Sequence, residues 1–161
     1  MDINDLGFGE NAVPLPSNFD VEKDGNNLEE IEKQWAVKAF HHAETYENLI
    51  KKVDGKKLKL TKDDLKLYKE FREAFPDLNI AQLDQERDFG GSLNKEKWRN
   101  YIVSYEKTIE DYNFGTLLRL NSSLGYHDNG VDNTMFATRL QFLAIEVARN
   151  MEGLNSKMLL S

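Results

Sequence analysis

The 161-residue sequence contains no cysteine. This absence excludes a disulfide framework, a thiolate nucleophile and a zinc site built from cysteine. The sequence also lacks an apolar run of the ~18 residues that would be needed to cross a bilayer. Its N-terminus has neither the basic region nor the apolar stretch of a secretory signal. We therefore expect a soluble protein without membrane contact in the cytoplasm, with the nucleus left open as a second compartment.

Positive charge is scarce, since 21 Lys and Arg residues stand against 28 Asp and Glu, for a net charge of −7. Non-specific nucleic-acid binding depends on Lys and Arg that neutralise phosphates, so we expect no direct nucleic-acid binding. The acidic balance suits a basic protein partner. One basic cluster comprises Lys51, Lys52, Lys56, Lys57, Lys59 and Lys62. It either contacts an acidic surface or RNA, or forms a solvated helix end and turn.

Proline is rare as well, and Pro14 and Pro16 are two of only three in the chain. The segment around them has several Asn, Asp and Gly residues and little hydrophobic periodicity, which predicts a flexible N-terminal arm over 1–26. The rest of the chain is long enough to bury one hydrophobic core. We expect a single globular domain over 27–155 and a C-terminal tail over 156–161.

Hydrophobic periodicity within the domain is that of α-helices. The expected helices span 27–53, 61–75, 92–112 and 136–150. The second is expected to begin at a capping box of Thr61 and Asp64 and to bury a stripe that includes Leu65. The polar stretch 84–94 is expected to be a loop. The predicted fold class is therefore mainly α, a compact bundle of about four to five helices.

Two apolar runs in the C-terminal third face each other across a polar loop. The first run, 116–120, is either a strand or the first turn of another helix. The loop contains Asp128-Asn129-Gly130, a tight-turn signal. A small β-hairpin that joins 116–120 to 134–138 just before the last helix is therefore one of two open alternatives.

Four charged residues lie within these apolar runs: Arg119, Arg139, Glu146 and Arg149. An unpaired buried charge is costly, so these residues must find partners. Arg139 and Glu146 are seven positions apart and face nearly the same way on a helix, and Glu146 and Arg149 form an i, i+3 pair. Arg119 can join them from the other run. We expect a structural polar network rather than a catalytic site.

The sequence contains no motif typical of a metal-binding, phosphate-binding or catalytic site. Neighbouring side chains such as His41 and His42 point about 100° apart on a helix, so they do not share a metal ion. In the stretch 128–133 Val131 takes a position where a calcium loop needs an oxygen ligand. Gly7-Phe8-Gly9 lacks the strand and the GK[ST] of a phosphate-binding loop. We expect no enzyme, and no catalytic, metal-binding or cofactor-binding residue.

Several stretches resemble the polysaccharide-biosynthesis-domain-containing protein 1 family of eukaryotes. They are QWAVKAFHHAETYENLI (34–50), LKLTKDDLKLYKEFREAF (58–75), KEKWR (95–99), IEDYNFGTLLRL (109–120) and RLQFLAIEVARNMEGLN (139–155). The motifs follow the family's order over about residues 27–155. The resemblance implies a small, mainly helical cytosolic protein. It also implies a dedicated chaperone for newly made translation elongation factor 1-alpha, which engages the GTP-binding domain of that factor during synthesis.

A client-specific chaperone needs exposed apolar and aromatic residues with charge around them. The candidate partner-binding residues are Tyr112, Asn113, Phe114, Arg119 and Tyr126. Plain core packing is the alternative for Phe114. Further partners would be ribosome-associated factors, and the chain is expected to be a monomer. The family name points to a different function, an enzyme of polysaccharide biosynthesis, and a generic interaction scaffold is a third alternative.

Overall fold

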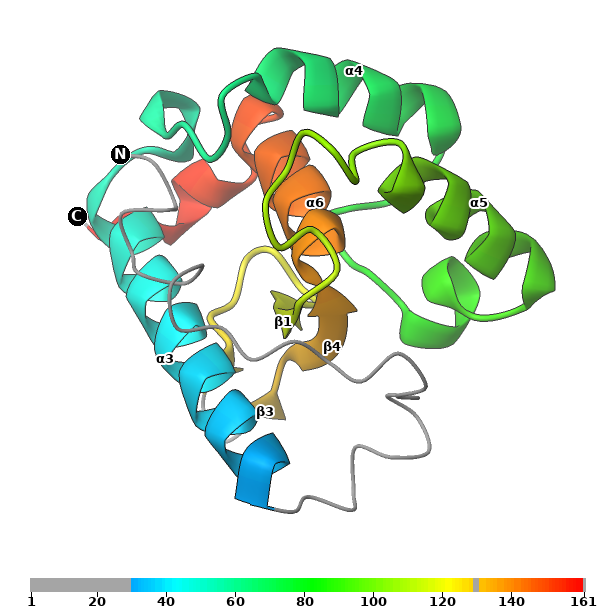
Figure 1. The fold of residues 1–161 in the computed structure, drawn as a ribbon. Coiled ribbons are helices and arrows are strands. Elements are labelled where there is room, and N and C mark those ends of the chain that lie inside the picture. Colours follow the sequence, from blue (N-terminus) through cyan, green and yellow to red (C-terminus); the bar gives the residue numbers. More distant parts are fainter. Residues whose placement is uncertain (1–29, 129–130, 161) are drawn as a thin grey trace.

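The computed structural model describes residues 30–128 and 131–160. The expected arm over 1–26 and the expected start of the first helix at Asn27 lie outside the described residues. Within them the chain is mainly α-helical, with a small antiparallel hairpin before the last helix (Figure 1), which confirms the predicted fold class. None of the helices that the structure describes is long and apolar enough to cross a membrane.

The elements fall into helices, short helical turns and strands. The α-helices are α3 (Glu30–Lys52), α4 (Asp64–Ala74), α5 (Ser92–Val103) and α6 (Arg139–Met151). The short turns are η2 (Gly55–Lys57), η3 (Gln85–Phe89) and η4 (Asn155–Met158). The strands are β1 (Gly115–Arg119), β2 (His127–Asp128), β3 (Val131–Asp132) and β4 (Thr134–Thr138).

Helix α6 lies at the centre of the molecule, with α3 on one side and α4 and α5 on the other (Figure 1). Its start is fixed by a reciprocal cap, in which the Thr138 hydroxyl accepts the Gln141 N–H and the Gln141 side chain accepts the Thr138 N–H. Every residue over 142–150 is buried. The predicted last helix is confirmed, and its neighbours on all sides account for its apolar sequence.

Helix α3 packs one face against the core and ends at a close approach to α6. The buried hydrophobic residues of that face are Ala39, Ala43, Tyr46 and Ile50, spaced at three or four positions. Gly55 follows in η2, where a Cβ atom would collide with the Asn150 side chain on α6. Glycine is therefore required at this position by the close contact between η2 and α6.

Helix α4 starts later than expected. The Asp63 side chain caps it by accepting the Lys66 N–H at 3.1 Å, whereas the Asp64 carboxylate turns back to the Thr61 N–H at 2.7 Å. The buried positions are therefore Leu67, Phe71 and Phe75. Leu65, which was expected in the buried stripe, is 53% exposed. The expected cap at Thr61 is thus wrong, because Asp63 takes that role.

Two expectations about residues 84–112 are wrong. The stretch 84–94 is not a plain loop, since it contains the π-helical turn η3, and α5 ends at Val103. The Ser104 hydroxyl donates to the Tyr101 carbonyl at 2.6 Å, a bond that competes with helical pairing. Further on, Asp111 adopts a φ of 56°, outside the right-handed helical region. The chain therefore curls back toward α6 instead of continuing the helix.

The hairpin forms with the predicted partners. Strands β1 and β4 are antiparallel, with Leu117 opposite Phe136 and Gly115 opposite Thr138. The strand alternative for 116–120 is thereby confirmed. Beyond it, β2 and β3 pair on either side of residues 129–130. Helices α3 and α6 both contact β1, so this strand is covered on both faces.

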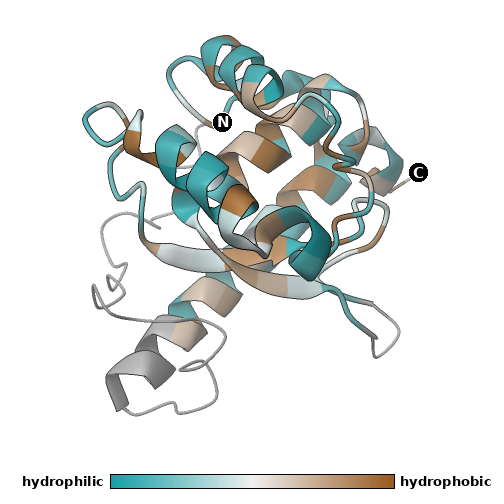
Figure 2. Ribbon diagram, turned by 90° about the vertical axis from the view of Figure 1, so that its right-hand side faces the viewer, coloured by the Kyte–Doolittle hydropathy of each residue, from teal (hydrophilic) through white to brown (hydrophobic). Residues whose placement is uncertain are grey.

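The chain turns after α6 at Gly153, which has a φ of 79°, and forms η4. Met158 in η4 is only 8% exposed, and the Leu160 N–H donates to the Lys51 carbonyl at 3.0 Å. The segment that was expected as a tail over 156–161 thus begins with residues that pack on the domain. In Figure 2 the hydrophobic residues gather toward the middle of the molecule, and the peripheral helices are largely hydrophilic.

Candidate functional site

Tyr112, Asn113 and Phe114, three of the predicted contact residues, lie on the turn between α5 and β1. The Phe114 carbonyl accepts the Arg139 N–H at 2.7 Å, and the Tyr112 carbonyl accepts the Leu140 N–H at 2.9 Å. The first N–H groups of a helix have no partner within it, so these bonds fasten the turn to the start of α6. Asn113 is exposed, and the two aromatic residues are half-buried.

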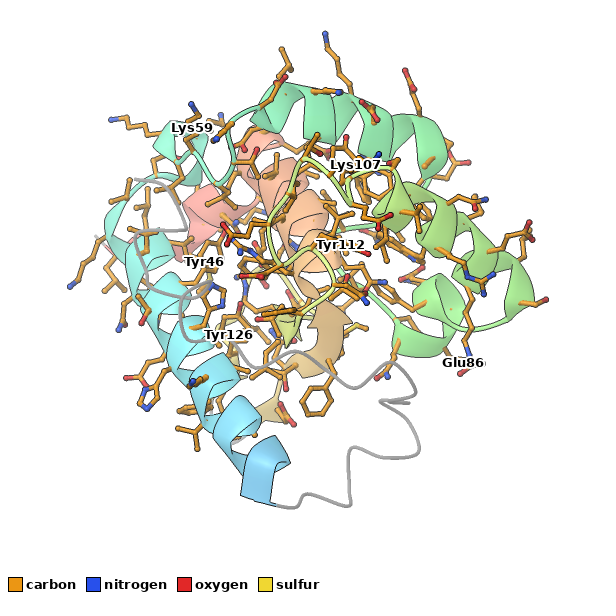
Figure 3. The ribbon with its side chains drawn as sticks, viewed as in Figure 1. Tyr46, Lys59, Glu86, Lys107, Tyr112 and Tyr126 are labelled. Atoms are coloured by element: carbon orange, nitrogen blue, oxygen red, sulfur yellow. The ribbon has the colours of Figure 1, made fainter. Side chains whose placement is uncertain are left out.

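The turn forms one wall of a surface groove of about 330 Å³, which we call the α5 groove. Its apolar lining consists of Phe89, Trp98, Ile102, Val103 and Tyr112. Its polar lining consists of Lys95, Arg99, Asn113 and Gln141. The groove thus joins η3, α5, the turn and α6. Figure 3 shows Tyr112 toward the α5 side of the molecule, whereas Tyr46 and Tyr126 lie toward α3.

The floor of the α5 groove is a stack of aromatic rings. Trp98 stacks on Phe89 with ring centroids 5.2 Å apart, and on Phe75 with centroids 4.2 Å apart. The Trp98 indole N–H donates to the Asp88 carbonyl at 3.1 Å. Because these rings are already packed and the indole is hydrogen-bonded, they lose little conformational freedom when a partner binds. The groove is therefore a preformed apolar surface.

One edge of the α5 groove is positively charged. Lys95 and Arg99 lie one turn apart on α5 and are exposed. Neither forms an ion pair with any side chain that the structure describes. Val103 follows one turn later and is 52% exposed. The groove thus offers apolar contact, amide hydrogen bonds and positive charge, a combination that suits a protein surface with an apolar residue beside an acidic one.

A network of buried charges lies between β1 and α6. The Glu146 carboxylate accepts from Arg119 at 2.9 Å and from Arg149 at 3.1 Å, and all three side chains are fully buried. The Asn155 amide donates to Glu146 at 2.9 Å and accepts from Arg119 at 2.6 Å. Other guanidinium N–H groups donate to the carbonyls of Ile80, Arg119, Leu120, Ser122 and Leu124. The network therefore ties β1, α6, η4 and the segment before η3 together.

Burial and pairing act in opposite directions on Glu146. Burial alone would raise the pKa of its carboxyl, but Arg119 and Arg149 lower that pKa to about 2. The carboxylate is therefore ionised at neutral pH and balances one of two buried positive charges. Backbone carbonyls solvate the excess charge, and the internal partners leave no side chain of the network facing solvent. This arrangement is suited to holding the fold.

Arg119 and Tyr126, also expected at the contact surface, lie in the interior instead. They are 0% and 5% exposed, respectively. The Tyr126 N–H donates to the Glu47 carboxylate on α3, and its hydroxyl donates to the Leu117 carbonyl at 3.4 Å. Because β1 is covered on both faces, its arginine faces the core. The expectation that these two residues touch a partner is therefore corrected by their burial.

Arg139 was grouped with the network by its spacing but lies apart from it. Its guanidinium donates to the Glu110 carbonyl at 3.1 Å and lies 3.8 Å from the Asp111 carboxylate. Burial raises the pKa of the Asp111 carboxyl, and Arg139 opposes that rise. Arg139 and Glu146 are seven positions apart on the helix, a distance of about 10 Å along the axis. A shared helix face therefore did not bring them into contact.

A second hollow of about 460 Å³ lies beside Arg139, between the start of α4 and residues 105–110. Its lining mixes Lys62 and Lys66 with Asp63 and Glu110. Among the described residues, no three His, Cys, Asp or Glu side chains are grouped so that they could hold a metal ion. The hollow therefore presents neither a metal-ligand cluster nor one sign of charge.

Of the residues that line the α5 groove, only Tyr112 and Asn113 were predicted from the sequence as contact residues. Helical periodicity assigns Trp98 and Ile102 to a buried face, which hides their role in the groove. Lys95 and Arg99 fall near the start of a helix, where positive charge opposes the helix dipole. That unfavourable placement is a signal that could have identified these two residues, but the sequence analysis drew no functional conclusion from it. For Asn155, a member of the buried network, the sequence offers no comparable signal.

Comparison with known proteins finds close relatives. The family model described as PBDC1 protein matches residues 31–160. Protein PBDC1 of Mus musculus is 50% identical over 129 residues, and Protein PBDC1 of Homo sapiens is 46% identical over 150 residues. These matches cover 80% and 93% of this chain but 63% and 60% of the mouse and human proteins. The chain thus spans less than two thirds of the length of these two relatives.

Two matches to yeast proteins cover nearly the whole length of those proteins. The Protein PBDC1 homolog of Saccharomyces cerevisiae is 47% identical over 142 residues, which cover 86% of this chain and 94% of the yeast protein. The solution NMR structure of protein yst0336 from Saccharomyces cerevisiae matches with a TM-score of 0.71 at 45% identity. That match covers 89% of this chain and 97% of the other, so the two share the fold.

Proposed function

This chain belongs to the PBDC1 protein family, and on that premise we propose that it is a non-enzymatic binding protein that acts as a chaperone. The resemblance carried by its sequence motifs is thereby confirmed. The proposed client is the one that this resemblance implies, newly synthesised translation elongation factor 1-alpha, bound through its GTP-binding domain. Binding during synthesis in the cytoplasm, beside ribosome-associated factors, is part of the same proposal.

The α5 groove is the observation that supports this proposal. A protein that is still folding exposes apolar side chains that it later buries, and a preformed aromatic floor can cover them meanwhile. A groove of about 330 Å³ accommodates only a few side chains. Contact over so small an area is weak, which allows the client to leave once it buries those side chains itself.

The charge distribution supports the proposal in two ways. The net charge of −7 favours encounter with a basic client, mainly by raising the association rate. Lys95 and Arg99 carry the opposite sign at the groove edge. They would orient a client segment in which an acidic residue stands beside the apolar one. The net charge of the whole chain then attracts the client, and the groove edge selects the segment.

A matched pair of substitutions tests the proposal. Val103 lines the groove and Leu65 on α4 does not, yet their exposed fractions are 52% and 53%. The wild-type chain and the Val103→Asp and Leu65→Asp variants serve as bait in a translation extract programmed with elongation factor 1-alpha. We expect Val103→Asp to reduce capture of the newly made factor by about tenfold, the effect of losing about 1.4 kcal/mol of binding free energy. Leu65→Asp should capture as the wild type does.

Two outcomes would contradict the proposal. Equal capture by both variants would remove the groove from the binding surface. Equal capture of the finished, nucleotide-loaded factor would mean that the chain binds the folded protein, which is not what a folding chaperone does.

A further inference from the structure

A second surface carries charge opposite to that of the whole chain. Residues 51–69 include eight lysines and three aspartates, a net charge of +5, so the rest of the chain carries −12. We define the lysine patch as Lys52, Lys56, Lys57, Lys59 and Lys62. All five side chains are exposed, and none of the five lines the α5 groove. The patch is therefore an independent surface.

The aspartates near the patch are engaged by other groups. The Asp54 carboxylate accepts the Ser156 hydroxyl at 2.6 Å, Asp63 caps α4, and Asp64 accepts the Thr61 N–H at 2.7 Å. No carboxylate in the part of the chain that the structure describes forms an ion pair with the five lysines. Their ammonium groups thus remain available to an external anion.

The fold holds the lysine patch in a defined arrangement. Leu58 and Leu60 are 9% and 1% exposed and alternate with Lys57 and Lys59. Because side chains of an extended segment alternate in direction, burying the leucines turns the lysines outward. Gly55 packs against α6 on one side of this segment, and α4 begins on the other. Figure 3 shows Lys59 near the outer edge of the molecule.

We propose that the lysine patch binds a short acidic segment of a partner protein, a run of Asp or Glu side chains in an extended conformation. Residues 52–62 contain no Arg and no aromatic residue, so they lack the bidentate and stacking groups typical of phosphate and base recognition. Outside the segment 51–69, residues 30–50 and 70–160 carry a net charge of −6, which repels a long polyanion that extends beyond the patch. A segment of about six residues spans about 20 Å and stays within it.

The test uses two labelled probes of similar charge, hexaglutamate and an RNA hexanucleotide, titrated with the full chain by fluorescence anisotropy. The patch variant is Lys57→Gln/Lys59→Gln, and the control is Lys97→Gln/Lys107→Gln, which removes the same charge from exposed positions elsewhere. We expect hexaglutamate to bind more tightly than RNA and more weakly as salt is added. The patch variant should lower its affinity by roughly fivefold, and the control by less than about twofold, as expected for exposed ion pairs.

Two results would overturn the proposal. Tighter binding of RNA than of the peptide would identify the patch as a phosphate-binding surface. An equal loss of peptide affinity in the patch and control variants would mean that attraction is spread over the whole molecule. The substituted lysines are exposed, so circular dichroism should show the same helix content in all three proteins.

Discussion

Glu146 holds two buried guanidinium groups in the interior of the domain. Arg119 and Arg149 both reach its carboxylate, and neither side chain contacts solvent. Removing one member of a buried ion pair is far more costly than removing an exposed one, because the remaining charge keeps its desolvation penalty. The stability of the centre of the fold therefore depends strongly on this one carboxylate.

We expect Glu146→Gln to lower the free energy of unfolding by about 3–5 kcal/mol, the usual cost of an uncompensated buried charge. A suitable control is Glu152→Gln, since Glu152 pairs with Arg72 at 2.9 Å but keeps 31% of its side chain exposed. Loss of that pair should cost less than about 1 kcal/mol. Urea unfolding followed by circular dichroism measures both. Similar losses in the two variants would mean that the buried network stabilises the fold no more than a partly exposed ion pair does.

His42 makes stability depend on pH. Burial, with a smaller contribution from Arg139, lowers the pKa of its imidazole from 6.5 to about 4. The folded protein thus keeps His42 neutral where the unfolded chain already binds a proton. The contribution of His42 to the free energy of unfolding is complete above pH 6.5. It is lost as the pH drops from 6.5 toward 4, at up to about 1.4 kcal/mol per pH unit. Glu146 adds a separate loss between pH 4.5 and about 2, because its folded pKa is lowered.

The matched variants His42→Gln and His41→Gln test this dependence. His42 is 6% exposed and its neighbour His41 is exposed. Replacing His42 should flatten the fall in unfolding free energy between pH 6.5 and 5, whereas replacing His41 should leave its slope unchanged. Urea unfolding at a series of pH values gives both slopes. An unaltered slope in His42→Gln would assign the pH dependence to other groups.

Among the structural elements, the hairpin and α6 could be predicted because their signals are local. The tight-turn signal at Asp128-Asn129-Gly130 and the apolar runs on both sides select the pairing of β1 with β4. Thr138 lies three residues before Gln141, the spacing of a capping box. Such features depend on a few neighbouring residues, so a single sequence contains them.

The end of α5 could not be predicted, because distant contacts decide it. Tyr105 and Ile109 continue the helical spacing well past Val103, where the helix ends. The turn forms because the first N–H groups of α6 take carbonyls of residues 112 and 114 as partners. The same limit applies to the candidate site. Tyr112 and Asn113 were identified as surface residues, but the sequence could not show that Arg119 lies on a strand covered on both faces.

The cap at the start of α6 should contribute to the stability of the fold. Thr138→Ala removes the hydroxyl that accepts the Gln141 N–H and should lower the free energy of unfolding by about 1 kcal/mol. The exposed Thr108 caps no helix that the structure describes, so Thr108→Ala should change stability by less than about 0.5 kcal/mol. Thermal unfolding monitored by circular dichroism compares the two. Equal shifts in melting temperature would show that the cap contributes nothing to α6.

At the scale of the whole molecule, a chain of negative net charge carries two positive features, the edge of the α5 groove and the lysine patch. A single partner that carries an apolar segment and an acidic run could contact both surfaces, and two contacts raise the effective concentration at the second. The buried network lies between β1 and α6, and of the elements that form the groove it holds α6.

The binding surface for the client can be observed directly by NMR. The GTP-binding domain of elongation factor 1-alpha, free of nucleotide, is titrated into the 15N-labelled chain, which has two indole N–H signals, those of Trp35 and Trp98. We expect the Trp98 indole, the Asn113 side-chain amide and the Val103 backbone amide to shift most, because they belong to the α5 groove. Unchanged signals from these residues, with shifts concentrated on α3 or the lysine patch, would contradict the groove as the client-binding surface.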